Sequence, residues 1–233
     1  SMTPAAGLET PEVLAQLGAA SAVACVYTFI CHAFLPRREF HGSPLYNWLS
    51  CLPIQLVGFP LVVSLAVGSF DGGAADWVAA PWSAMDGTWE RAYLLLMWGY
   101  LFKDCALYAV GGGMDAMYWA HHVVCWATVF NFFYTDLCAI FLVGGSAMEF
   151  GGASQTLHLI FAESQLMDKV HVFTMTASHV VACGMAVYYL SLPAAPLAAR
   201  LVFGTVVFGL SFERQKYAMK LHREAADRFA KRA

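Results

Sequence analysis

The sequence predicts an all-α membrane protein, a polytopic bundle of about seven transmembrane helices that enclose a polar chamber. Of its 233 residues, 59% are apolar and only 12% are charged, whereas a soluble domain carries about 25% charged residues. A series of apolar runs matches the length that crosses a bilayer, about 20 residues. Several of these runs contain ionisable side chains, which are costly in hydrocarbon unless they line a cavity or do chemistry. The net charge of −3 argues against a nucleic-acid partner.

Seven apolar runs define the predicted elements. They cover residues 13–35, 46–70, 89–110, 114–134, 136–161, 169–190 and 196–217. Pro36 ends the first run, and Pro53 and Pro60 predict a kink in the second. The fourth and fifth runs are joined so tightly that they must form an antiparallel hairpin. The segment 79–88, with Trp77 and Trp82 nearby, is predicted to lie along the interface as a short surface helix.

The distribution of basic residues predicts the orientation in the membrane. Arg37, Arg38 and the basic residues from Lys216 onward fall on one side, and the opposite loops carry aspartates. The positive-inside rule then places the N-terminus in a lumen or outside and the C-terminus in the cytosol. The chain divides into a short lumenal N-terminus (1–12), a seven-span membrane domain (13–217) and a charged cytosolic tail (218–233). We expect the endoplasmic reticulum as the compartment.

The polar residues within the runs gather at one depth. Four runs place an ionisable group about 10–20 Å from the predicted cytosolic helix ends, at a rise of 1.5 Å per residue. These groups are Asp104, the adjacent pair His121 and His122, Glu149 and His179. Their agreement predicts a polar chamber that opens toward the cytosolic leaflet. Single members also have structural interpretations, because Lys103 and Asp104 can form an ion pair and His179 can be a hydrogen-bonded bundle residue.

These residue types are suited to acyl transfer. A neutral imidazole can remove a proton from an amine or hydroxyl, or attack a thioester itself. A buried carboxylate can hold an imidazole in the required tautomer. We therefore predict as catalytic residues His121, His122, Glu149 and Asp104, and as substrate-binding residues Lys103, Tyr100, Tyr118, Ser146, Thr156 and His179. No metal site is expected, because the seven cysteines show no CxxC spacing.

The stretch 100–161 resembles the TLC-domain superfamily, which includes ceramide synthases, translocating-chain-associated membrane proteins and small TLC-domain proteins. The resemblance rests on three motifs, namely Gly99-Tyr100-Leu101-Phe102-Lys103-Asp104, Met117-Tyr118-Trp119-Ala120-His121-His122-Val123-Val124 and Met148-Glu149-Phe150. It covers residues 45–217. The matching histidine pair of ceramide synthases is required for N-acylation of a sphingoid base by acyl-CoA. Because Glu149 stands without neighbouring aspartates, the chain is more similar to the small TLC-domain proteins.

The resemblance and the residues together favour a lipid acyltransferase or a related lipid-modifying enzyme, acting by acyl-CoA-dependent transfer as ceramide synthases do. This interpretation implies no bound cofactor. It implies acyl-CoA as co-substrate and a membrane lipid or fatty-acyl group as the other partner. Lys103, Arg37 and Arg38 would meet the acidic head of acyl-CoA. We keep open whether the chain forms a homodimer.

Three alternatives remain at this point. The first is a non-enzymatic lipid-binding protein that controls membrane lipid composition or protein export, and the missing second carboxylate supports it. A transporter is disfavoured because no inverted repeat is evident. A diiron lipid hydroxylase is disfavoured because the sequence lacks clustered histidines at ligand spacing.

Overall fold

The computed structural model describes residues 9–111, 116–135, 138–193 and 195–231. The described residues are almost entirely helical, which confirms the all-α class. They form nine α-helices, one π-helical turn, one 3₁₀ turn and a single pair of two-residue strands. The chain separates into two compact units, residues 1–142 and 143–233.

The first unit is built around α5 (Thr88–Gly111), which packs lengthwise against α1 (Thr10–Phe34). A glycine makes this contact close, because a Cβ on Gly99 would lie 3.2 Å from the carbonyl oxygen of Ala20. The helix α1 begins where Glu12 accepts a hydrogen bond from the backbone N–H of Glu9 at 2.8 Å. It ends at Phe34, because Pro36 disfavours helical backbone at the residue before it.

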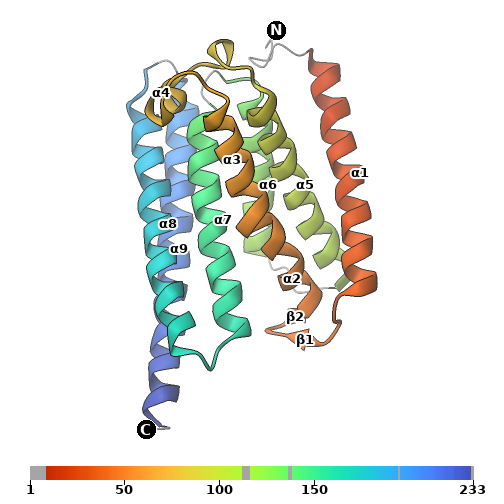
Figure 1. Ribbon diagram of the computed structural model, residues 1–233, viewed down its shortest axis with the longest axis vertical. Helices are drawn as coiled ribbons and strands as arrows, with labels where there is room; N and C mark the ends of the chain where they lie inside the picture. Colours follow the sequence, from red (N-terminus) through yellow and green to blue (C-terminus); the bar gives the residue numbers. More distant parts are fainter. Residues whose placement is uncertain (1–8, 112–115, 136–137, 194, 232–233) are drawn as a thin grey trace. The chain divides into compact units, whose positions relative to one another are not determined.

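The second predicted run is a single rod with a widened turn in its middle (Figure 1). It consists of α2 (Leu45–Pro53), the π-helical turn η1 (Ile54–Gly58) and α3 (Phe59–Gly68). Within η1, the N–H of Phe59 donates to the carbonyl of Ile54, five residues earlier. Pro53 and Pro60 flank this turn, and neither has an N–H to continue the regular ladder. A π-helical turn thus lies between the two prolines for which a kink was predicted.

Short elements join these helices. The strands β1 (Glu39–Phe40) and β2 (Ser43–Pro44) form a hairpin between α1 and α2 that the apolar pattern did not predict. Its two central residues, His41 and Gly42, both have positive φ angles, of 48° and 76°, as a tight hairpin turn requires. The helix α4 (Ala74–Ala79) and the 3₁₀ turn η2 (Trp82–Ala84) precede α5.

The prediction of a surface helix over 79–88 is wrong. Trp77 is 0% exposed and Trp82 is 4% exposed, so both rings face the protein. The indole N–H of Trp77 donates to Glu90 Oε1 at 2.6 Å, and that of Trp82 donates to the carbonyl of Phe132 at 3.2 Å. These bonds attach the connecting segment to α5 and to the end of α6 (Ala116–Phe132).

The second unit contains most of α7 (Ala139–Ile160), with α8 (Gln165–Ser191) and α9 (Leu197–Ala230). The helices α8 and α9 lie side by side along their length (Figure 1). Four small buried residues of α9 recur every seven positions, namely Gly204, Ser211, Ala218 and Ala225. This spacing keeps one face of α9 against its neighbour. The predicted boundary at residue 217 falls inside this continuous helix.

A buried polar cluster joins the three helices of the second unit. The carboxylate of Asp168 on α8 lies 2.7 Å from Nδ1 of His222 on α9 and 3.9 Å from Nδ1 of His158 on α7. The rings of His158 and His171 stack with their centroids 5.1 Å apart. His158 is 1% exposed. The C-terminal extension of α9 is thus tied to the bundle through His222.

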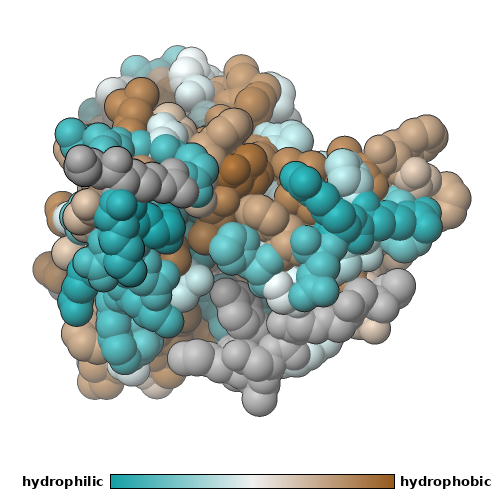
Figure 2. Space-filling view, turned by 90° about the horizontal axis from the view of Figure 1, so that it is seen from below, coloured by the Kyte–Doolittle hydropathy of each residue, from teal (hydrophilic) through white to brown (hydrophobic). Residues whose placement is uncertain are grey.

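Three helical segments are long and apolar enough to cross a membrane, namely Thr10–Phe34, Leu45–Gly68 and Gln165–Ser191. Their outward faces are apolar; Phe29, Phe34 and Phe173 are each more than 70% exposed. The projecting end of α9 is hydrophilic, as the left side of Figure 2 shows. These features are consistent with a transmembrane protein. The remaining predicted spans are helices, and among them α5 carries four charged residues along its length.

Candidate functional site

The first unit buries two opposite charges side by side on α5. Lys103 is 1% exposed and Asp104 is 8% exposed, and their side chains form an ion pair. Burial of a lone charge costs several kcal/mol, so each charge makes the other tolerable. Lys103 therefore does not extend to the surface. It also lies over the ring of Tyr100, with Nζ 5.1 Å from the ring centroid.

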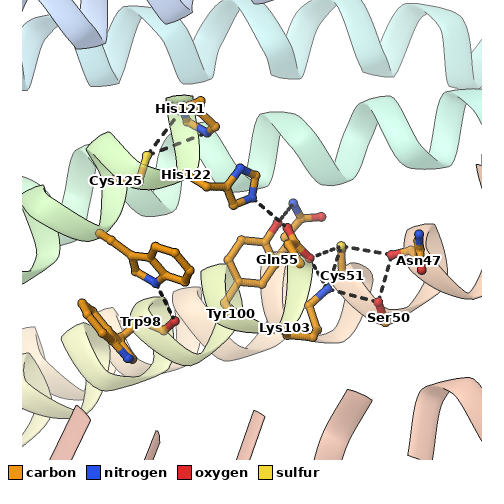
Figure 3. Close-up of polar contacts among 12 residues, drawn as sticks. Asn47, Ser50, Cys51, Gln55, Trp98, Tyr100, Lys103, His121, His122 and Cys125 are labelled. Carbon is orange, nitrogen blue, oxygen red and sulfur yellow. Dashed lines mark hydrogen bonds and ion pairs between the residues drawn. The ribbon is translucent and has the colours of Figure 1, made fainter. Parts of the chain in front are cut away.

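The histidine of α6 that meets this pair is His122. Its side chain is buried, and its Nε2 lies 3.6 Å from Asp104 Oδ2 (Figure 3). A carboxylate at this nitrogen favours the tautomer that carries the proton on Nε2, which leaves Nδ1 as the ring atom able to take up a proton. Asp104 thus holds both Lys103 and His122, one with each oxygen.

The neighbouring imidazole of His121 differs from that of His122 in its exposure and in its contacts. It is partly exposed, and its ring meets that of His122 edge to face with centroids 5.3 Å apart. One helical turn further along α6, the sulfur of Cys125 lies 3.5 Å from Nδ1 of His121. The contact with the buried carboxylate of Asp104 is made by His122.

The helix α2 supplies further polar side chains, which together with Lys103, Asp104 and His122 form the polar cluster of the first unit. The ammonium of Lys103 donates to Ser50 Oγ at 3.1 Å and to Cys51 Sγ at 3.2 Å. The Cys51 sulfur also lies 3.6 Å from Asp104 Oδ1. Figure 3 shows Ser50 and Cys51 on one helix facing Lys103 on α5. One thiol, one ammonium, one carboxylate and one imidazole thus meet in a buried site.

A second polar contact supports the cluster from η1. The amide of Gln55 donates to the hydroxyl of Tyr100 at 2.9 Å. Gln55 is 5% exposed and Tyr100 is 6% exposed. Phe59 packs edge to face against Tyr100, with ring centroids 5.5 Å apart. The widened turn therefore fixes the α5 face from which Lys103 and Asp104 project.

The three helices bring their residues to a common depth. Cys51 is six residues from the start of α2, His122 is six residues from the start of α6, and Asp104 is seven residues from the end of α5. At 1.5 Å per residue these positions lie about 9–11 Å from the helix ends. All three ends lie at the hairpin end of the first unit in Figure 1.

The predicted site residues divide between the two units. The structure brings together Tyr100, Lys103, Asp104, His121 and His122 in the first unit. The side chain of Tyr118 lies outside the described residues. The other four predicted residues belong to the second unit. Ser146 and Glu149 are partly exposed, Thr156 is buried, and Nδ1–H of His179 donates a 2.9 Å hydrogen bond to Gln215 Oε1.

The sequence interpretation missed Ser50, Cys51 and Gln55. It gave no role to Cys51 or to the polar residues of the second run. A signal was present, because Asn47, Cys51 and Gln55 recur every fourth position in an otherwise apolar helix. Such a stripe places polar groups on one helix face, and a polar face within an apolar segment indicates a buried partner.

The side chains that meet here are of types that can transfer protons and act as nucleophiles. Within the described residues, no group of three or more histidine, cysteine or acidic side chains is placed to hold a metal ion. The residues present can instead orient an imidazole, stabilise negative charge and supply a thiol. In comparisons with protein-family models, characterised proteins and solved structures, nothing matches the chain.

Proposed function

We propose that the protein is a membrane enzyme that transfers a fatty-acyl group from acyl-CoA to a lipid amine or alcohol, with His122 as general base. The observation that carries this proposal is the buried contact between His122 Nε2 and Asp104 Oδ2, at 3.6 Å. An imidazole oriented by a carboxylate is the arrangement that enzymes use to deprotonate a nucleophile. The likeness of the surrounding motifs to the TLC-domain superfamily supports the same reaction.

The proposal includes the seven-span topology. The membrane is crossed by α1, the α2–α3 rod, α5, α6, α7, α8 and α9. The C-terminus is cytosolic, and the compartment is the endoplasmic reticulum. The buried cluster then lies about 10 Å from the cytosolic helix ends, where the acyl-CoA head group is available. Arg37 and Arg38 are exposed at the same end of the first unit, and their positive charge suits the phosphates of CoA.

The proposal is tested with purified protein reconstituted into lipid vesicles and supplied with isotope-labelled acyl-CoA. A panel of acceptors with amine or hydroxyl head groups, including a sphingoid base, is added, and labelled lipid products are identified by mass spectrometry. The variant His122→Ala should lower product formation by about 100-fold or more, the usual contribution of a general base. Asp104→Asn should lower it for the same reason, because the imidazole loses its orienting carboxylate.

The matched control is His41→Asn, which removes an exposed imidazole of the same unit. Asparagine is chosen because position 41 has a φ of 48°, which asparagine tolerates. This variant should retain wild-type activity. If wild-type protein yields no labelled product with any acceptor, and wild type and His122→Ala retain the same unmodified lipid, the enzyme is excluded in favour of a lipid-binding protein.

A further inference from the structure

The thiol of Cys51 is the one strong nucleophile within the described cluster, and it lies between the groups that nucleophilic catalysis needs. Its sulfur is 3.2 Å from the Lys103 ammonium and 3.6 Å from the Asp104 carboxylate. A nearby cation stabilises the thiolate, which is the reactive form of cysteine. We propose that Cys51 accepts the acyl group as a thioester before the group passes to the lipid. This inference rests on the proposed acyl transfer and specifies its intermediate.

The charges of the cluster fit this role. The charges of Lys103 and Asp104 cancel, so a thiolate at Cys51 adds one negative charge to the buried site. A protonated His122 would balance this added charge. Asp104 contacts both Cys51 and His122, one with each carboxylate oxygen. Transfer of the thiol proton to the imidazole therefore leaves the net charge of the four side chains unchanged. Buried sites tolerate such internal transfers better than a change of net charge.

The reaction balances in two steps. In the first, the Cys51 sulfur attacks the carbonyl carbon of acyl-CoA, the bond from that carbon to the CoA sulfur breaks, and the thiol proton ends on the departing CoA. In the second, the lipid amine or hydroxyl attacks the Cys51 thioester, the bond to sulfur breaks, and the acceptor proton returns to Cys51. The Lys103 ammonium stabilises the charge on sulfur in both steps. No oxidant or additional reactant is required.

A second observation points to a ligand beside this thiol. The side-chain amide of Asn47, which is 2% exposed, makes no hydrogen bond among the described residues through either its oxygen or its nitrogen. Asn47 lies one helical turn before Cys51 on α2, and the Cys51 thiol donates to the backbone carbonyl oxygen of Asn47 at 3.2 Å. Buried amides are nearly always paired. The acyl carbonyl or the acceptor head group would supply the missing partner.

The test uses the reconstituted full chain with acyl-CoA and no acceptor. Intact-protein mass spectrometry should show the mass of one added acyl group, which neutral hydroxylamine removes because it cleaves thioesters. Peptide mapping should place the group on Cys51. With an acceptor present, initial rates should follow ping-pong kinetics, as expected for a covalent intermediate. Cys51→Ala should lose the adduct and at least about 100-fold of the turnover.

Two variants keep the result interpretable. Cys51→Ser retains a hydrogen-bonding group toward Lys103 and should fold but form no hydroxylamine-sensitive adduct. Cys105→Ser alters the buried thiol next to Asp104 and should keep both adduct and turnover. Wild-type turnover in Cys51→Ala, or an adduct on another residue, overturns the role of Cys51 while acyl transfer stands. Absence of both adduct and product in the wild type overturns the proposed function as well.

Discussion

At the scale of single residues, the first unit contains a buried ion pair between Lys103 and Asp104. Both side chains are buried, so the ion pair must form when α5 packs against its neighbouring helices. Its partners extend to Ser50, Cys51 and His122. A pair of this kind is weak evidence for stability in itself, but loss of one member leaves a buried charge without compensation.

Lys103→Met should therefore lower the free energy of unfolding by about 3–5 kcal/mol, since it leaves Asp104 unpaired. The double variant Lys103→Met/Asp104→Asn should recover most of this loss, because no charge then remains. Thermal unfolding in mild detergent measures both effects. Equal destabilisation by the single and double variants would contradict a paired, buried origin for the effect.

Residue identity at the site was only partly predictable from the sequence. The charges on α5 and the histidines on α6 stood out, because ionisable residues are rare in apolar segments. Cys51 did not, since cysteine is also a common apolar core residue. Its role depends on the distance to Lys103, a contact between residues that lie 52 positions apart. Such contacts follow from how helices pack, which apolar periodicity does not specify.

At the scale of elements, close approach between α7 and α8 depends on a glycine. A Cβ added to Gly151 would collide with Ser178 Oγ and would lie 3.1 Å from its Cβ and 3.3 Å from the sulfur of Met175. Ser178 Oγ also donates to the carbonyl of Met175 at 2.8 Å, so it cannot move without loss of that bond. Small residues at such contacts allow helices in membranes to pack closely.

Gly151→Ala should consequently destabilise the protein by about 1–3 kcal/mol through overpacking. The second change Ser178→Gly, made in that background, should relieve part of the loss. Gly184→Ala on α8 is the control, because a Cβ there meets nothing within 4 Å and alanine favours helix by up to about 1 kcal/mol. The measurement is thermal unfolding in detergent, and an unchanged midpoint in Gly151→Ala would show that the helices are not held in close contact.

The sequence predicted the positions of the long helices more accurately than the structure of the short segment before α5. Each of the seven predicted runs is a helix whose ends fall within a few residues of the prediction, except that α9 continues to Ala230. The reason is that proline, glycine and charge changes mark the ends of apolar runs. The segment before α5 was misjudged, because tryptophan occurs both at membrane interfaces and in cores. Only packing showed Trp77 and Trp82 to be buried.

At the scale of the whole molecule, the number of membrane crossings is the property on which the proposed function depends. Three helical segments meet the length and hydropathy of a span, whereas seven are proposed. The two topologies differ in the position of the loop after α7, at residues 161–164. With seven spans this loop is cytosolic. With crossings only by α1, the α2–α3 rod and α8, it lies on the lumenal side.

An epitope inserted after Glu163, an exposed residue of that loop, distinguishes the two arrangements. In cells whose plasma membrane alone is permeabilised, seven spans predict that antibody reaches this epitope. An epitope at Gly42 should be reached in both arrangements, and one at Gly73 in neither. Protection of the Glu163 epitope, with the two reference positions behaving as stated, would exclude the seven-span topology.

The π-helical turn affects which face of α3 in the α2–α3 rod points toward α5. Asn47, Cys51, Gln55 and Phe59 recur every fourth residue, and in a regular α-helix each step of four drifts by about 40°. The wider turn at Ile54–Gly58 offsets part of this drift, so Phe59 still meets Tyr93 and Tyr100. Deletion of one residue from this turn would rotate α3 by about 100° relative to α2. Cys51 would stay beside Lys103, while the aromatic contacts that hold α3 against α5 would be lost.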